Sequence, residues 1–216
     1  MSMKPTVIFD FDGTLANTLE LVANIYNEHA AQFGARQIDM NKFDEYRKLG
    51  YKKATKKAGI RWTVLPRMVL FISKEMKAHM GSVKPYDGIV QVLKDIQQAG
   101  MTIGVLTSND AQLVRDFFDA HGFPHFDFIV SEKTLFGKDK ALKRIMKRHG
   151  LAHEQVLYVG DEPRDIAASH KAGIRVVGVT WGVGGRVGLE PTKADAQVDT
   201  PRELKEALFK MNGLPH

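Results

Sequence analysis

Short apolar runs alternate with helical patterns through the second half of the chain. Each run is four to six residues long and rich in β-branched side chains, whereas the stretches between them carry apolar residues at helical spacing. The runs occupy residues 101–106, 126–130, 156–159 and 175–179, and the helical patterns lie near 87–99, 110–121, 139–149 and 164–172. Near-continuous apolar strands that alternate with helices are typical of a parallel sheet covered on both faces. Together with an apolar run at 6–9, the pattern predicts an α/β fold built on a doubly wound parallel sheet.

Residues 16–82 interrupt this alternation. They hold three helical patterns but no convincing strand, and these patterns lie near 16–33, 40–58 and 64–80. We therefore predict a small α-helical cap domain at 16–82, inserted after the first strand. The α/β core is then formed by residues 1–15 and 83–216, with a glycine-rich loop at 182–188.

The composition excludes several kinds of site. The chain has no cysteine, so disulfides, thiolate metal sites and cysteine nucleophiles are excluded. No apolar run approaches the ~20 residues that cross a bilayer, and the N-terminus leads into the first predicted strand without a signal-peptide pattern. We expect a cytoplasmic protein with no membrane partner, present as a monomer or a homodimer.

The positive charge is concentrated in the predicted cap. The chain has a formal net charge of +6, yet residues 41–80 alone hold 11 Lys or Arg against three acidic residues, a net charge of +8. Such a segment attracts an anionic substrate or partner. Nucleic-acid binding by this basic segment is an alternative function, although no nucleic-acid recognition motif accompanies it. A solvated helix surface is the simplest interpretation of any single lysine here.

Two carboxylates stand at the end of the first predicted strand. Asp10 and Asp12 follow the apolar run, and Gly13 favours a turn directly after them. A turn there lets one carboxylate act as a nucleophile while the other carries a proton, and both can share a divalent cation. An Asx-turn at a strand end is the alternative interpretation of these residues taken alone.

Polar side chains also follow two later strands. They are Thr107, Ser108 and Asn109 after one run, and Asp161 and Asp165 after another. Because ligand sites of open parallel sheets lie outside the carboxyl ends of the strands, we expect these groups to gather with the first pair of carboxylates. Helix N-capping is an alternative role for Thr107.

In this order and spacing, the motifs resemble those of the haloacid dehalogenase superfamily and are most similar to its phosphoglycolate phosphatase-like members. Four segments carry the resemblance, which covers nearly the whole chain. They are Asp10-Phe11-Asp12-Gly13-Thr14, the apolar run into Thr107, Lys138 within Phe136-Gly137-Lys138-Asp139-Lys140, and Gly160-Asp161 followed by Asp165. The resemblance implies a Mg²⁺-dependent phosphatase that hydrolyses a small phosphorylated molecule through an aspartyl phosphate. Phosphoglycolate is one candidate substrate.

The resemblance also assigns roles to the carboxylates. Asp10 is implied to be the nucleophile, and Asp12 the general acid and base. The side chains of Asp10 and Asp161 and the backbone carbonyl of Asp12 are implied to hold Mg²⁺, with Asp165 completing the metal site from its periphery.

Further residues are implied to bind the phosphoryl group. The Thr107 hydroxyl donates to a phosphoryl oxygen, with the backbone amides of Ser108 and Asn109 beside it. Lys138 neutralises the phosphoryl charge and orients the nucleophile. Lys140 competes for this role, and Lys138 is preferred because it stands at the start of the predicted helix.

The acid at position 12 favours phosphoryl transfer over dehalogenation, because a dehalogenase needs no acid two residues after its nucleophile. A sugar-phosphate mutase or a nucleotidase of the same superfamily is an alternative. Substrate choice is expected to come from the cap. There Arg47 and Lys48 are candidates for contact with a second anionic group of the substrate, such as a carboxylate.

Overall fold

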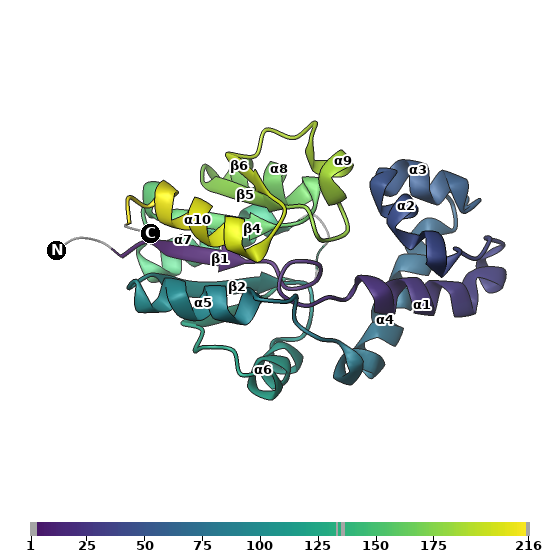
Figure 1. Ribbon diagram of the computed structural model, residues 1–216, viewed down its shortest axis with the longest axis horizontal. Helices are drawn as coiled ribbons and strands as arrows, with labels where there is room; N and C mark the ends of the chain where they lie inside the picture. The colour runs from purple at the N-terminus through teal and green to yellow at the C-terminus, as the bar shows by residue number, and fades with distance from the viewer. Residues whose placement is uncertain (1–3, 133, 135–136, 215–216) are drawn as a thin grey trace.

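One parallel sheet forms the centre of the protein (Figure 1). The computed structural model describes residues 4–132, 134 and 137–214. Its strands lie in the order β3-β2-β1-β4-β5-β6. They are β1 Thr6–Phe9, β2 Thr102–Thr107, β3 Phe128–Ser131, β4 Val156–Gly160, β5 Arg175–Val179 and β6 Ala196–Val198. Phe9 pairs with Val105 of β2 and with Val159 of β4, so the carboxyl ends of these three strands lie side by side.

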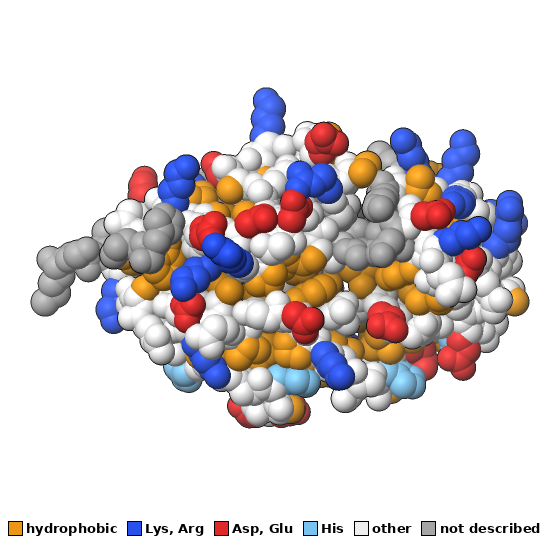
Figure 2. Space-filling model, viewed as in Figure 1, with side chains coloured by type: hydrophobic (Ala, Val, Ile, Leu, Met, Phe, Trp, Pro, Cys, Tyr) orange, Lys and Arg blue, Asp and Glu red, His pale blue; other side chains and the backbone are white. Residues whose placement is uncertain are grey.

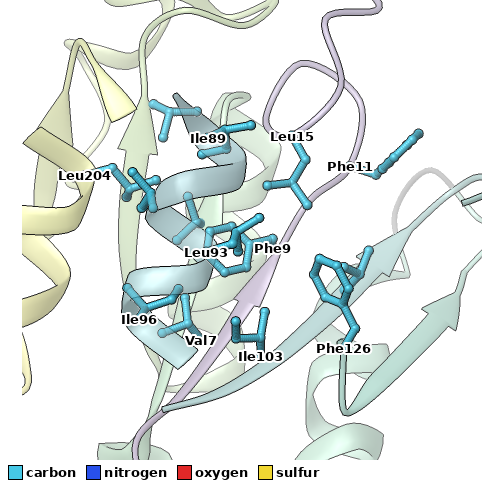
Figure 3. Packing of buried hydrophobic residues seen from close by; sticks show 14 of the residues in the cluster. Val7, Phe9, Phe11, Leu15, Ile89, Leu93, Ile96, Ile103, Phe126 and Leu204 are labelled. Carbon is cyan, nitrogen blue, oxygen red and sulfur yellow. The ribbon is translucent and has the colours of Figure 1, made fainter. Parts of the chain in front are cut away.

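Helices cover both faces of the sheet. They are α5 Ile89–Gln98, α6 Ala111–Ala120, α7 Lys138–His149, α8 Pro163–Ala172, the short α9 Gly185–Leu189 and α10 Pro201–Met211. Val7 and Phe9 of β1 pack with side chains of α5, α6 and α10, whereas Ile8 packs with side chains of α7 and α8. Figure 3 shows Phe9 beside Leu93 and Val7 beside Ile96, both residues of α5. Burial on both faces explains why β1 is apolar throughout rather than alternating.

Four further helices form a second cluster at one end of the sheet (Figure 1). They are α1 Leu19–His29, α2 Phe43–Lys48, α3 Gly50–Lys57 and α4 Leu65–His79, with short 3₁₀ turns at Ala30–Phe33, Met40–Lys42 and Met80–Ser82. These helices have their own apolar core, which includes Tyr26, Met68 and Ile72. Lys and Arg side chains crowd this end of the molecular surface in Figure 2.

The chain leaves the sheet and returns to it through two adjacent segments. The amide of Asn17 donates to the carbonyl of Lys84 at 2.8 Å, and the amide of Tyr86 donates to the carbonyl of Leu15 at 3.2 Å. The helical cluster α1–α4 is therefore joined to the sheet by a paired neck.

The predicted fold class is confirmed, and the remaining differences concern short or divided elements. Each expected strand and helix of the core is present, but the helical pattern at 40–58 is divided between α2 and α3. The expected glycine-rich loop is wrong in part, because α9 begins at Gly185. The sequence pattern does not predict β6 or α10, and β6 has only three residues. Among the described helices, none is long and apolar enough to span a membrane.

Candidate active site

Three strand ends build one acidic site. Asp10 directly follows β1, Asp161 directly follows β4, and Thr107 is the last residue of β2. All three side chains are buried, although each lies where a strand gives way to a loop. The sheet order places β1 between β2 and β4, so the topology alone brings these residues together.

Lys138 holds two of the carboxylates. Its Nζ donates to Asp10 Oδ2 and to Asp165 Oδ1, each at 2.6 Å, and it is the first residue of α7. Burial alone would lower the pKa of Lys138, but the carboxylates of Asp10 and Asp165 outweigh burial and raise it well above its ordinary value. Lys138 is therefore a permanent cation. Lys140, the competing residue, is exposed.

Asp10 is held at both carboxylate oxygens. Its Oδ1 accepts the backbone amide of Phe11 at 2.8 Å, while Oδ2 accepts Lys138. Burial raises the pKa of Asp10 and the carboxylate of Asp165 raises it further, against the opposing effect of Lys138. The carboxylate is thus fixed in orientation and poorly solvated, two properties that suit a nucleophile.

The side chain of Asp12 interacts with Asn109 and with the hydroxyl of Thr18. Its Oδ2 accepts the side-chain amide of Asn109 at 2.6 Å, whereas its buried Oδ1 has no hydrogen-bond partner among the described residues. Burial and the neighbouring Asp10 raise the pKa of Asp12 to about 7, although Lys138 and the Thr18 hydroxyl oppose the shift. A carboxyl group that titrates near neutral pH can give up and take back a proton in a reaction.

The side chain of Thr107 is hydrogen-bonded to the backbone of Asn109. The Thr107 Oγ1 accepts the backbone amide of Asn109 at 3.0 Å, which leaves the hydroxyl proton of Thr107 available for donation. The backbone amide of Asn109 is therefore already engaged in a hydrogen bond, while the neighbouring Ser108 is exposed. Helix N-capping by Thr107 is wrong, because Asp110 caps α6 by accepting the amide of Gln112.

Asp161 accepts hydrogen bonds from two segments. One is the loop after β5, which the sequence motifs do not assign to the site, and the other is the segment that contains Thr14. The amide of Val183 donates to Asp161 Oδ2 at 2.6 Å, and the Thr14 hydroxyl donates to Oδ1 at 3.2 Å. Burial, together with Glu162 and Asp165, raises the pKa of Asp161 well above its ordinary value. The glycine-rich stretch after β5 is the sequence signal for such a loop, since Gly182 allows close approach of the backbone.

Replacing Gly182 by Ala should destabilise the protein. A Cβ atom there would lie 2.2 Å from Asp161 Oδ2 and 2.3 Å from the Gly13 carbonyl oxygen, so one of these groups must move. We expect the free energy of unfolding to fall by about 1–3 kcal/mol, as measured by denaturant titration. Gly188→Ala is the matched control, because that position opens onto free space. Equal stability of the two variants would contradict the close packing described for this loop.

The carboxylates fit a divalent cation. Oxygens of Asp10, Asp161 and Asp165 lie within 4.8 Å of one another. The described site also contains Asp12 and Glu162, so that five carboxylates face only two cationic side chains, Lys138 and Arg164. Hard oxygen ligands and excess negative charge favour a hard divalent cation over softer metals. Asp165 already binds Lys138 and the Glu162 amide, which suits it to a supporting position.

The two cap residues expected to select the substrate lie on α2, and the side chains of Arg47 and Lys48 fall outside what the structure describes. Their contact with a substrate stays a prediction.

Comparison with known proteins identifies the family. Residues 7–179 match the family model of the haloacid dehalogenase-like hydrolases. The chain is 29% identical to a phosphoglycolate phosphatase of Synechococcus elongatus, over 95% of this chain and 97% of that protein. It is 24% identical to the pyrophosphatase PpaX of Bacillus mycoides, over 96% and 98%. A predicted phosphatase from Clostridium acetobutylicum has a similar fold, with a TM-score of 0.75 and 22% identity over 97% of this chain and all of that one. The resemblance seen in the motifs is confirmed, and the chain belongs to the haloacid dehalogenase-like hydrolase family.

Proposed function

We propose that this protein, a phosphatase of the haloacid dehalogenase-like hydrolase family, hydrolyses small phosphate monoesters in two steps. The observation that carries the proposal is the pair of carboxylates at the end of β1. Asp10 is fixed by the Lys138 cation, and Asp12 is a half-buried acid with a pKa of about 7. The two groups thus differ in the way that nucleophilic and acid-base catalysis require. Residues 16–82 are proposed to cap the site and help exclude water.

In the first step, Asp10 attacks the phosphorus atom and the bond to the leaving-group oxygen breaks. Asp12 gives its proton to that oxygen, so the leaving group departs as a neutral alcohol. In the second step, Asp12 takes a proton from water, and the water oxygen attacks the phosphorus of the aspartyl phosphate. Inorganic phosphate leaves, while Asp10 is regenerated as a carboxylate and Asp12 as an acid. The proton that Asp12 donates first is thus replaced in the second step.

Thr107 and Lys138 stabilise the phosphoryl group through both steps. Thr107 Oγ1 accepts the Asn109 amide and can donate its own proton to a phosphoryl oxygen. Lys138 keeps Asp10 in place and supplies positive charge beside it. Mg²⁺ would be held by the carboxylates of Asp10 and Asp161 and the carbonyl of Asp12, where it would neutralise phosphoryl oxygens.

The proposal is tested by release of inorganic phosphate from p-nitrophenyl phosphate and from a panel of phosphorylated metabolites. We expect turnover of the aryl ester and of at least some of the metabolites. Absence of turnover with every ester, together with salt-sensitive retention of nucleic acid, would instead favour the alternative function of the basic cap.

Replacing Asp12 by Ala should affect substrates unequally. For an alkyl phosphate we expect turnover to fall by roughly 10²–10⁴-fold, because the leaving alkoxide needs a proton. With p-nitrophenyl phosphate, whose leaving group needs no proton, the first step should survive and the aspartyl phosphate should accumulate. Rapid-quench measurement of the nitrophenol burst checks this. Asp12 has no such role if both substrates lose the same fraction of their first-step rates.

Activity should depend on Mg²⁺ and be suppressed by Ca²⁺. Calcium prefers a larger and looser shell of oxygen ligands, so we expect it to engage both oxygens of Asp10 and leave neither free to attack. Removing the metal with a chelator should lower phosphate release by at least about tenfold, and Mg²⁺ should restore it. Full activity in chelator, or with Ca²⁺ alone, would contradict the metal assignment.

A further inference from the structure

An apolar cavity, open to solvent on part of its surface, lies among the helices of the cluster α1–α4. Its volume is about 300 Å³, roughly ten times the space of one water molecule in the liquid. All four helices contribute to its wall, as does the loop that follows β5. Leu19, Ala54, Met68, Met76 and Val183 are among the lining residues. Among the described residues that line the cavity, none is charged.

The helical period explains how this basic segment can border an apolar space. On α3, Lys53, Lys56 and Lys57 are exposed, whereas Ala54 and Ala58, the residue that caps α3 four residues later, line the cavity. The lysines are therefore exposed while the small alanines face the cavity, and the Lys57 ammonium lies 4.4 Å from the ring centroid of Tyr46, another lining residue. The hydroxyl of Tyr26, another lining residue, is already used in a bond to the Arg36 carbonyl.

The cavity adjoins the catalytic carboxylates at two points. Val183, which lines it, donates its backbone amide to Asp161. Leu19 lines the cavity as well and directly follows Thr18, whose hydroxyl interacts with the Asp12 carboxylate and opposes the rise of its pKa. One hydrogen bond thus links the cavity wall to Asp161, the proposed metal ligand. On the other side, Leu19 is followed back along the chain by Thr18, which contacts the proposed acid Asp12.

The proposed mechanism determines what would extend into this space. Asp12 protonates the leaving-group oxygen, so the carbon skeleton of the leaving group must begin beside Asp12. The nearest lining residues, Leu19 and Val183, lie next to Thr18 in the chain and in a hydrogen bond to Asp161, respectively. An apolar cavity with uncharged walls this close to the proposed acid is typical of a ligand-binding site.

We propose that the cavity holds the leaving group of the substrate and that this group is an apolar alkyl or aryl chain rather than a small carboxylate. This inference rests on the proposed phosphatase function. It narrows the substrate class to phosphate monoesters with an extended apolar portion, and it differs from the second anionic group that the charge of the cap suggested.

The test is a series of straight-chain alkyl phosphates from methyl to hexyl, compared with phosphoglycolate. We expect kcat/KM of the wild-type protein to rise by about two- to fourfold for each added methylene, as apolar carbon leaves water. Hexyl phosphate should exceed phosphoglycolate. A flat series, or a preference for phosphoglycolate, would overturn the inference while leaving the phosphatase function intact. If no ester releases phosphate, the proposed function fails, and this inference fails with it.

Two variants and one binding measurement test whether the dependence on chain length arises in the cavity. Ala54→Phe fills the cavity and should abolish the dependence on chain length, whereas Ala31→Phe, at an exposed alanine of the same cluster, should keep it. Calorimetry of the wild-type protein with hexylphosphonate and methylphosphonate provides a second readout, independent of turnover and of whether Ala54→Phe folds. Tighter binding of hexylphosphonate supports the proposal, and equal binding of the two would overturn it.

Discussion

Replacing Asp10 by Asn should lower the rate of phosphate release by at least about a thousandfold while leaving the fold intact. The amide is nearly the same size as the carboxylate but is a very weak nucleophile, so the first step has no route. Phosphate release from p-nitrophenyl phosphate with Mg²⁺ measures the loss. Asp119→Asn, at an exposed aspartate on α6, is the control and should keep full activity.

The stability of the Asp10→Asn variant is a second part of this expectation. A carboxylate whose pKa is raised in the folded state, as that of Asp10 is, disfavours folding at a pH where it must be ionised. Removing its charge relieves repulsion from Asp165, and Lys138 keeps Asp165 as a partner. In chelator at neutral pH, we expect the free energy of unfolding to change by less than about 1 kcal/mol. A large loss of stability would mean that Asp10 is mainly structural.

Replacing Lys138 by Met should affect both stability and activity. Lys138 is the buried cation that pairs with Asp10 and Asp165, and its loss leaves two buried carboxylates without their shared partner. We expect the free energy of unfolding to fall by about 3–5 kcal/mol at neutral pH, and phosphate release to be lost as well. Destabilisation should shrink as the pH falls, because protonated carboxyl groups need no cation.

Lys140→Met is the matched control for this experiment. Lys140 lies two residues further along α7 and is exposed, so its loss should change stability by no more than about 0.5 kcal/mol. Adding Asp165→Asn to the Lys138→Met variant should recover part of the lost stability, since it removes one unpaired charge. If Lys138→Met and Lys140→Met were equally stable, the ion pairs around Lys138 would carry little energy.

The strand-end residues are predictable from the sequence for a simple reason. Apolar runs fix where strands end, and a parallel sheet brings those ends to one edge, so the sequence alone places Asp10, Thr107 and Asp161 together. Contacts that depend on how loops close cannot be predicted in the same way. The Val183 amide reaches Asp161 only because the backbone at Gly182 passes close to it.

The apolar cavity shows a different limit of sequence reasoning. The charge of 41–80 is a sum over residues and carries no information about direction, whereas a helix separates its charged and apolar sides. On α3, Lys53, Lys56 and Lys57 are exposed, whereas Ala54 and the following Ala58 line the cavity. The short strand β6 escapes prediction because three residues carry too little pattern to identify.

The most direct test of the central claim is to trap the covalent intermediate on Asp10. The Asp12→Ala variant is mixed with p-nitrophenyl phosphate and Mg²⁺, quenched rapidly, and treated with borohydride, which reduces an acyl phosphate to an alcohol. Peptide mass spectrometry should then find homoserine at position 10. Reduction at another carboxylate, or an unmodified Asp10 after a clear burst of nitrophenol, would contradict the account.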